Sequence, residues 1–502
     1  MFRENCIKAE EMEKYFEHFR QQTIGNDLEF KTPFGIQKMI YADWVASGRL
    51  YAPIEEKIQK SFGPWVANTH TETSESGTLT TKAYHHAQQI IKKHVNANSN
   101  DVLITTGNGM TGVINKFQRI LGFKQYGAKN HPFNKLDFLS EEKRPIVFIT
   151  HMEHHSNQTS WEETIADVVV LQPDENMLVD ENELIKKLEE YKNREIKIGS
   201  FTACSNVTGV RTNHHRLARI MHEHNGLCFI DFAANAPYDS INMHPADEME
   251  KLDAIFFSPH KFLGGPGSSG VLVFNKELYH NNVPDNPGGG TVEWTNPWGQ
   301  YKYIDNIETR EDGGTPGFLQ AIRIALVIQL KEKMGIENIH KREDQLIDKA
   351  FKGLKKIPKL HILSENVKDR LGVISFYIED VHFNLIVKIL NDRFGVQVRG
   401  GCACAGTYGH FLLGVSPEQS KEISDKINSG DLSEKPGWVR LSLHPTMTDA
   451  DLDTVINGLE QLVENIDEWA KEYVYDSKSN EFKHITDISD KEEIVKPWFN
   501  IN

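Results

Sequence analysis

Between about residues 80 and 270, short apolar runs rich in β-branched and aromatic residues alternate with longer amphipathic stretches. This alternation is typical of βαβ units. The runs are hydrophobic on both faces, as expected for strands that helices cover on both sides. We therefore predict a buried, mostly parallel sheet. Its predicted strands are 101–105, 145–150, 198–202, 227–231 and 254–257.

The pattern changes from about Gln320 onward, where two helical periodicities and two candidate strands follow one another. Apolar residues recur at helical spacing over 321–334 and near 384–394, and the runs 372–378 and 438–442 have the composition of strands. A mixed order of this kind predicts a second, smaller α+β domain.

Two segments, 124–144 and 281–311, are long, polar and rich in Gly, Pro and Asn. We predict that they are loops or lids, since long loops in compact domains are often functional. Their sequences carry no recognisable chemistry and leave the shape of a substrate pocket open. The tail after Tyr475 is polar and charged, which predicts a loosely held end of the chain.

Composition and charge then narrow the class of protein. Among 502 residues, Lys and Arg number 56 and Asp and Glu 71, a net charge of −15 that would repel nucleic acid and anionic membranes. No apolar stretch is long enough to cross a membrane, and the charged start differs from a secretory signal. Five cysteines are too few for a disulfide scaffold. We expect a cytoplasmic protein that binds neither nucleic acid nor membrane.

Chemically reactive side chains stand at the ends of the predicted strands. The strand at 254–257 is followed by Ser258, His260 and Lys261 and then by a glycine-rich turn. Burial makes the neutral amine of a lysine available for Schiff-base chemistry, although an ordinary lysine that reaches solvent explains the segment equally well. Asp231 ends the preceding strand, where ligands bind in open α/β sheets. It could pair with a protonated pyridine nitrogen or cap the next turn.

Three more strand ends carry polar residues whose individual meaning is open. Residues 105–112 form a Gly/Thr turn, where backbone N–H groups and Thr111 could bind phosphate or simply start a helix. His154 lies in a histidine cluster that could stack on an aromatic cofactor, relay protons or bind metal. Asn206 could donate to a ligand oxygen or start a turn. Five successive strand ends thus carry a phosphate-type turn, His154, Asn206, Asp231 and Lys261, and this ordered set is far more specific than any member.

The ordered set resembles the class V aminotransferase family of fold-type I enzymes that use pyridoxal phosphate (PLP), and within it the cysteine desulfurases, especially the group with selenocysteine-lyase-like members. The resemblance runs from about Tyr41 to Leu462, and its motifs are Tyr41-Ala-Asp-Trp-Val-Ala-Ser, Met152-Glu-His-His-Ser-Asn and Ser258-Pro-His-Lys. It implies an α/β large domain, with a mostly parallel seven-stranded sheet covered by helices, and a smaller α+β domain. The implied divisions are an N-terminal segment joining the small domain (1–60), the large PLP-binding domain (61–318), the small domain (319–475) and a polar tail (476–502).

The resemblance also implies a role for each site residue, with pyridoxal 5′-phosphate as the cofactor. Lys261 would form the internal aldimine, Asp231 would face the pyridine nitrogen, and His154 would stack on the ring. Asn206 would lie near the phenolic oxygen and the substrate carboxylate. Arg440 would clamp that carboxylate with its planar fork, and Ala46 and Arg399 would also contact the substrate. The phosphate would be surrounded by Met110, Thr111, Ser258, His260 and, from the neighbouring subunit of a homodimer, Thr315.

The segment Val398-Arg-Gly-Gly-Cys-Ala-Cys-Ala-Gly contains the candidate nucleophile. In the second desulfurase group the catalytic cysteine follows a loop arginine by five positions, and Arg399 plus five is Cys404. The resemblance therefore implies that Cys404 forms a persulfide, while nearby Cys402 leaves open which cysteine reacts. A metal site of Cys402, Cys404 and His410 and a redox dithiol are the competing interpretations. We expect no metal, because a Cys-x-Cys without a second pair is weak evidence for zinc.

The implied reaction converts L-cysteine to L-alanine, with the sulfur held on Cys404 until an acceptor protein collects it. Two positions depart from the family's usual sequence: Ala234 stands where a Gln commonly binds the cofactor, and Ala403 stands where a His commonly precedes the cysteine. These departures leave two alternatives open. One is another class V reaction on a different amino acid, by an aminotransferase, an epimerase or a C–S or C–Se lyase. The other is a non-catalytic binding protein.

Overall fold

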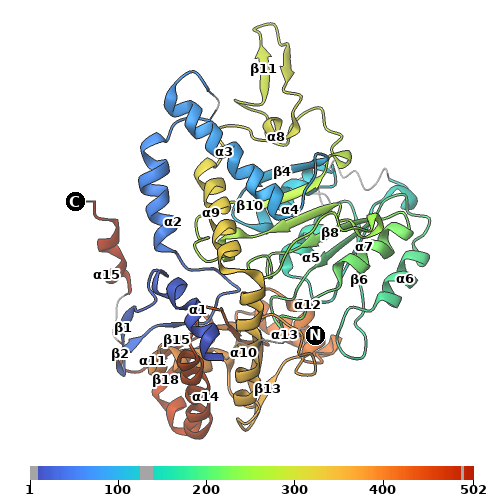
Figure 1. The fold of residues 1–502 in the computed structure, drawn as a ribbon. Coiled ribbons are helices and arrows are strands. Elements are labelled where there is room, and N and C mark those ends of the chain that lie inside the picture. The colour runs from blue at the N-terminus through green and yellow to red at the C-terminus, as the bar shows by residue number, and fades with distance from the viewer. Residues whose placement is uncertain (1–8, 70, 125–138, 488–490, 502) are drawn as a thin grey trace, which may run out of the picture.

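The computed structural model describes residues 9–69, 71–124, 139–487 and 491–501. Its centre is a seven-stranded sheet with the order β4-β10-β9-β8-β7-β5-β6 (Figure 1). Neighbouring strands from β9 to β6 are parallel, whereas β10 is antiparallel to both of its neighbours. The strands are β4 (Asp101–Thr106), β5 (Ile146–Ile149), β6 (Asp167–Val170), β7 (Lys197–Thr202), β8 (Leu227–Asp231), β9 (Ala254–Phe257) and β10 (Gly270–Asn275).

Alternate residues of these strands fill two separate cores, one on each face of the sheet. On one face, Val102 and Ile104 of β4 pack with α4 (Met110–Ile120) and α5 (His155–Glu162). On the other, Leu103 belongs to a core that includes α7 (His214–Glu223) and α9 (Phe318–Met334). A strand that is covered on both faces tolerates few polar positions. The prediction of a buried, mostly parallel sheet is therefore confirmed, with all five predicted strands present.

A four-stranded antiparallel sheet with the order β13-β14-β17-β16 forms the second part of the molecule. Its strands are β13 (Leu360–Ile362), β14 (Val373–Ile378), β16 (Arg399–Gly401) and β17 (Trp438–Ser442). Helix α11 (Phe383–Phe394) packs on β16 and β17, and α14 (Asp449–Trp469) packs on α11. The elements predicted for this region are thus present.

The N-terminal segment joins this second part. Strand β3 (Ile40–Tyr41) pairs in parallel with β15 (Val396–Gln397), and α1 (Ala9–Gln21) packs on α10 (Ile336–Leu354). Asp43 forms an isolated bridge with Ser442 of β17, which brings the residues after β3 to the edge of the second sheet. This pairing brings Trp44 and Val45 into the apolar core that the two sheets share.

The prediction of a loop over 281–311 is wrong for its second part, from Val292 onward, whereas residues 281–291 form no helix or strand. Strands β11 (Val292–Thr295) and β12 (Tyr301–Tyr303) form an antiparallel hairpin, and α8 (Ile307–Arg310) follows. The Asn296 side chain closes the turn by accepting the Trp298 and Gln300 N–H groups, so the polar composition marked a hairpin turn. Most of the other predicted loop, residues 125–138, lies outside the described residues.

The prediction of a loosely held tail is also wrong for its first part. Strands β18 (Tyr473–Asp476) and β19 (Glu481–His484) form a hairpin that packs on α11. The reason lies in aromatic residues within a polar sequence: the Tyr475 and Phe482 rings lie 4.7 Å apart, and both lie 5.3 Å from the ring of His382. After this hairpin, α15 (Lys491–Val495) lies at the edge of the molecule (Figure 1).

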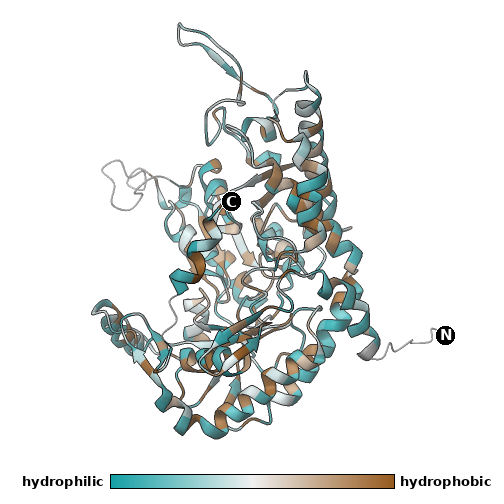
Figure 2. Cartoon of the chain, turned by 90° about the vertical axis from the view of Figure 1, so that its left-hand side faces the viewer, coloured by the Kyte–Doolittle hydropathy of each residue, from teal (hydrophilic) through white to brown (hydrophobic). Residues whose placement is uncertain are grey.

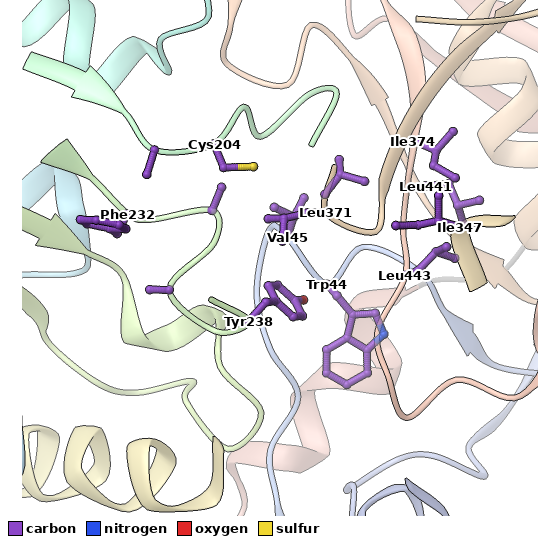
Figure 3. Close-up of a cluster of buried hydrophobic side chains, with 14 of the residues drawn as sticks. Trp44, Val45, Cys204, Phe232, Tyr238, Ile347, Leu371, Ile374, Leu441 and Leu443 are labelled. Carbon is purple, nitrogen blue, oxygen red and sulfur yellow. The ribbon is translucent and has the colours of Figure 1, made fainter. Parts of the chain in front are cut away.

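One apolar core continues from the large sheet to the second sheet. Figure 3 shows part of it, where side chains from widely separated parts of the chain meet: Trp44, Val45, Cys204, Phe232, Tyr238, Ile347, Leu371, Ile374, Leu441 and Leu443. Hydrophobic residues concentrate on inner strands and helix faces, and the projecting hairpin β11–β12 is mostly hydrophilic (Figure 2). In the described parts of the chain, no helix combines the length and apolarity needed to cross a membrane.

Candidate active site

A cavity of about 180 Å³ opens at the carboxyl ends of the parallel strands, with residues of β16 and β17 completing its wall. Because the carboxyl ends of parallel strands meet at one edge of a sheet, the strand-end residues of the sequence converge there. The wall contains every predicted site residue except Thr315: Ala46, Met110, Thr111, His154, Asn206, Asp231, Ser258, His260, Lys261, Arg399, Cys404 and Arg440.

Lys261 and Asp231 reach the cavity from neighbouring strand ends. A short 3₁₀ helix, Pro259–Lys261, follows β9, and Asp231 is the last residue of β8. Desolvation lowers the pKa of Lys261 from 10.5 to about 8, an effect that the Asp231 carboxylate opposes. Desolvation also raises the pKa of Asp231 to about 6, although its Oδ1 accepts the Ala233 N–H at 2.8 Å. An amine that loses its proton near neutral pH suits Schiff-base chemistry.

His154 stands at the start of α5 and caps this helix. Its Nδ1 accepts the Ser156 backbone N–H at 3.1 Å, so the neutral ring carries its proton on Nε2. Desolvation lowers the pKa of His154 to about 3, and the nearby Lys261 charge adds to the effect. The Ser156 hydroxyl, which the sequence did not single out, lies 2.6 Å from the Thr111 hydroxyl. His154 thus contributes a neutral aromatic ring to the cavity wall.

The turn between β4 and α4 forms the other end of the cavity. Gly109 has a φ of 92°, and a Cβ on it would lie 2.8 Å from the His260 ring and 3.0 Å from Ser258 Oγ. Only glycine therefore fits this turn without strain. Ser258 Oγ accepts the Met110 N–H at 2.9 Å. A helix start beside hydroxyl and imidazole groups is an arrangement that binds phosphate.

Arg440 is buried and paired within the protein. Its Nη2 donates to Asp43 Oδ1 at 2.7 Å, and its Nη1 donates to the backbone carbonyl of Asn206 at 3.3 Å. Arg399 Nε donates to the second Asp43 oxygen at 3.1 Å. The buried Arg440 Nε has no hydrogen-bond partner among the described residues. Sequence reasoning missed Asp43, although it stands in the Tyr41-Ala-Asp motif.

Cys404 is exposed and lines the cavity, whereas Cys402 is half-buried against an apolar cluster that includes Tyr408 and Trp438. The preceding residue, Ala403, accepts a 2.8 Å hydrogen bond at its carbonyl from Asn206 Nδ2. Asn206 Oδ1 is buried and has no partner in the described structure. The cavity therefore brings Cys404, and not Cys402, to Lys261 and Arg440.

Thr315 lines an adjoining cavity of about 600 Å³ that shares Asn108 and His260 with the first. That Thr315 contacts the phosphate in the site of the neighbouring subunit stays a prediction. Ala234 lines the site, and the neighbouring Asn235 does not replace the family's Gln, since its amide donates to Asp239 at 3.1 Å.

Cys402, Cys404 and His410 are not placed together as metal ligands in the described structure. The two ring nitrogens of His410 lie 2.8 Å from the Gly406 carbonyl and 2.8 Å from the Ser420 hydroxyl. Over the described ranges, no group of three or more His, Cys, Asp or Glu side chains is placed to hold a metal ion. The metal interpretation of this segment is therefore not supported by its geometry.

Residues 40–455 match the family model of the class V aminotransferases, and the chain belongs to this family. Curated relatives include a probable cysteine desulfurase of Staphylococcus aureus, which is 27% identical over 430 residues, covering 85% of this chain and 93% of the relative. A probable cysteine desulfurase of Staphylococcus epidermidis is 27% identical over 437 residues, with the same coverage. The predicted family is confirmed.

Solved structures show the same fold. The apo cysteine desulfurase of Thermococcus onnurineus superposes with a TM-score of 0.71 at 22% identity, covering 89% of this chain and 98% of that one. The cysteine desulfurase CsdA of Escherichia coli, in its S-sulfonic acid form, gives a TM-score of 0.66 at 20% identity, covering 92% and 99%. The predicted fold class is confirmed.

Proposed function

We propose that this protein is a PLP-dependent cysteine desulfurase, which converts L-cysteine to L-alanine and holds the sulfur as a persulfide on Cys404. The observation that carries the proposal is the convergence of Lys261, Arg440 and Cys404 on one cavity from three different parts of the chain. An amine, a carboxylate-binding guanidinium and a thiol are the groups that this reaction needs. The names of the curated relatives support the same activity.

The cavity residues fit pyridoxal phosphate. Lys261 would bind the aldehyde carbon of the cofactor, and the buried Asp231 carboxylate would pair with its ring nitrogen. The His154 ring would stack on the cofactor ring. Gly109 leaves space beside Ser258 and His260 that a Cβ would fill. That space and the start of α4 would take the phosphate. Bound pyridoxal phosphate withdraws electrons from the substrate Cα and so makes the Cα proton removable.

The protein's own groups would orient the substrate and move its proton. Arg440 uses one Nη1 N–H and one Nη2 N–H within the protein. Its remaining N–H groups, including the buried Nε–H that has no partner in the described structure, would bind the α-carboxylate. Desolvation lowers the pKa of Lys261 to about 8, so its amine is neutral far more often near neutral pH than that of an ordinary lysine, and it can take the Cα proton. His154 cannot serve as a base at Nδ1, because that atom accepts the Ser156 N–H. Its Nε2–H is available only as a donor.

The sulfur step would use Cys404. Its thiolate attacks the substrate sulfur, so that an S–S bond forms while the Cβ–S bond breaks, and the released electron pair with one proton completes alanine. L-cysteine and the Cys404 thiol therefore give L-alanine and a Cys404 persulfide, with all atoms conserved. Because Cys404 is exposed, an acceptor protein could collect the sulfur. The proposal includes a homodimer, in which Thr315 of each subunit completes the other site, and a cytoplasmic location.

Absorption spectra of the purified wild type and of Lys261→Ala, followed by L-cysteine addition with a dithiol reductant, test the proposal. We expect a visible cofactor band that is lost in Lys261→Ala, and formation of alanine and sulfide by the wild type only. Cys404→Ala should keep the band and lose turnover, while Cys402→Ser should keep both. A band without cysteine turnover would assign the protein to another class V reaction, and no band with added pyridoxal phosphate would refute the cofactor.

A further inference from the structure

The turn that carries Cys404 has a strained backbone. Residues 402–405 form a tight turn that is closed by a 3.0 Å hydrogen bond from the Ala405 N–H to the Cys402 carbonyl. Its two middle residues, Ala403 and Cys404, have φ values of 50° and 57°. Residues other than glycine rarely adopt this left-handed conformation, and it persists only where surrounding contacts hold it. The contacts around Cys404 therefore determine where its thiol lies.

His155, the first residue of α5, makes two of these contacts. Its backbone N–H donates to the Cys404 carbonyl at 2.8 Å, and its Nε2 accepts the Gly406 N–H at 2.9 Å. Gly406 is the first residue of α12 (Gly406–Leu412), and the Ala405 N-cap provides no side-chain hydrogen bond. The first N–H groups of a helix lack intrahelical partners. The His155 imidazole satisfies one of them from a distant part of the chain.

Neighbouring residues support the same contact. A Cβ on Gly406 would lie 3.1 Å from His155 Nε2, so glycine allows the close approach. Gln158, one turn further along α5, accepts the Thr407 hydroxyl at 2.8 Å. On the other side of Cys404, Asn206 donates to the Ala403 carbonyl at 2.8 Å. Residues that follow β5 and β7 thus fix the backbone on both sides of the thiol.

We propose that His155 is a positioning residue, whose imidazole and backbone N–H together fix the Cys404 turn at the wall of the cavity. Because its Nε2 accepts a hydrogen bond, its ring must be neutral with the proton on Nδ1. The adjacent His154 has the opposite tautomer, since its Nδ1 accepts. Two consecutive histidines therefore serve different parts of the site. The His154 ring lines the cavity, and the His155 ring fixes the turn that carries Cys404. The catalytic meaning of this contact rests on the proposed desulfurase function.

The test compares His155→Phe with His155→Gln as holoenzymes. Phenylalanine keeps a ring but cannot accept the Gly406 N–H, whereas the glutamine amide oxygen can. We expect hydrogen–deuterium exchange in peptides covering 402–407 to be about tenfold faster in His155→Phe, and kcat for alanine formation about tenfold lower. KM for L-cysteine and the cofactor absorption band should stay close to wild type. His155→Gln should restore both the exchange rate and kcat.

Gly406→Ala tests the same contact from its other side, and it also serves if His155→Phe fails to fold. The methyl group of Gly406→Ala would displace the His155 imidazole, so both substitutions break the same contact. In the double variant His155→Phe/Gly406→Ala, kcat should therefore be no lower than in either single variant. Wild-type exchange and kcat in both His155→Phe and Gly406→Ala would overturn the inference. Faster exchange in His155→Phe, with a wild type that forms no alanine from L-cysteine, would instead refute the desulfurase proposal and leave the structural role of His155 standing.

Discussion

Asp43 Oδ1 accepts a hydrogen bond from Arg440 Nη2 at 2.7 Å, across 397 residues of sequence. The second Asp43 oxygen binds Arg399 Nε at 3.1 Å. One carboxylate therefore holds two guanidinium groups at the cavity wall, and the three groups together keep one net positive charge. That charge suits the carboxylate of an amino-acid substrate, and the Asp43 carboxylate offsets the repulsion between the two arginines.

Replacing Asp43 by alanine should destabilise the protein. Loss of one partner leaves the buried Arg440 charge uncompensated, which costs about 3 kcal/mol of unfolding free energy. Urea unfolding measures this cost. Asp369→Ala is the matched control, because Asp369 also pairs with an arginine, at 3.1 Å, but is 91% exposed. Its removal should cost less than about 1 kcal/mol. Equal effects of the two substitutions would show that the Asp43 pair contributes no more than a surface pair.

The chemistry at the strand ends could be predicted from the sequence because parallel strands bring their carboxyl ends together. Lys261, Asp231, His154 and Asn206 each follow an apolar run, so their order along the chain already indicates a common site. Asp43 could not be predicted in the same way, since its partners lie 356 and 397 residues away and only the tertiary fold brings them together.

The parts of the fold that were predicted wrongly are short hairpins in polar sequence. The β11–β12 hairpin is closed by the Asn296 side chain, and the β18–β19 hairpin is held by packing of Tyr475 and Phe482 against His382. A few aromatic residues or one turn-closing side chain are enough to order such a segment on a folded surface. Average polarity does not reveal these local contacts.

The pH dependence of cofactor binding should report the lowered pKa of Lys261. Only the neutral amine attacks an aldehyde, so the rate at which apo protein and pyridoxal phosphate form the visible band should rise with pH through about 8. An ordinary lysine would give a midpoint near 10.5. Asp231→Asn removes a charge that stabilises the ammonium, and the midpoint should move below that of wild type. A wild-type midpoint near 10.5 would show that the amine is not desolvated.

Gly109→Ala should weaken cofactor binding by at least about tenfold, because its methyl group would meet His260 and Ser258 and its φ of 92° disfavours alanine. Titration of apo protein with pyridoxal phosphate measures the affinity. Gly122→Ala is the matched control: its φ is 75°, but a Cβ there meets nothing within 4 Å. Both substitutions carry backbone strain of about 1 kcal/mol, and only Gly109→Ala should change the affinity. Equal affinities in the two variants would argue against a phosphate site at this turn.

The central claim is that Cys404 accepts sulfur from L-cysteine in a reaction that requires Lys261. Mass spectrometry of alkylated peptides, after the holoenzyme has reacted anaerobically with L-cysteine, tests it most directly. We predict one added sulfur atom on the Cys404 peptide, a matching amount of alanine, and neither product in Lys261→Ala. A wild-type holoenzyme that leaves the Cys404 peptide without added sulfur, although L-cysteine is in excess, would contradict the account.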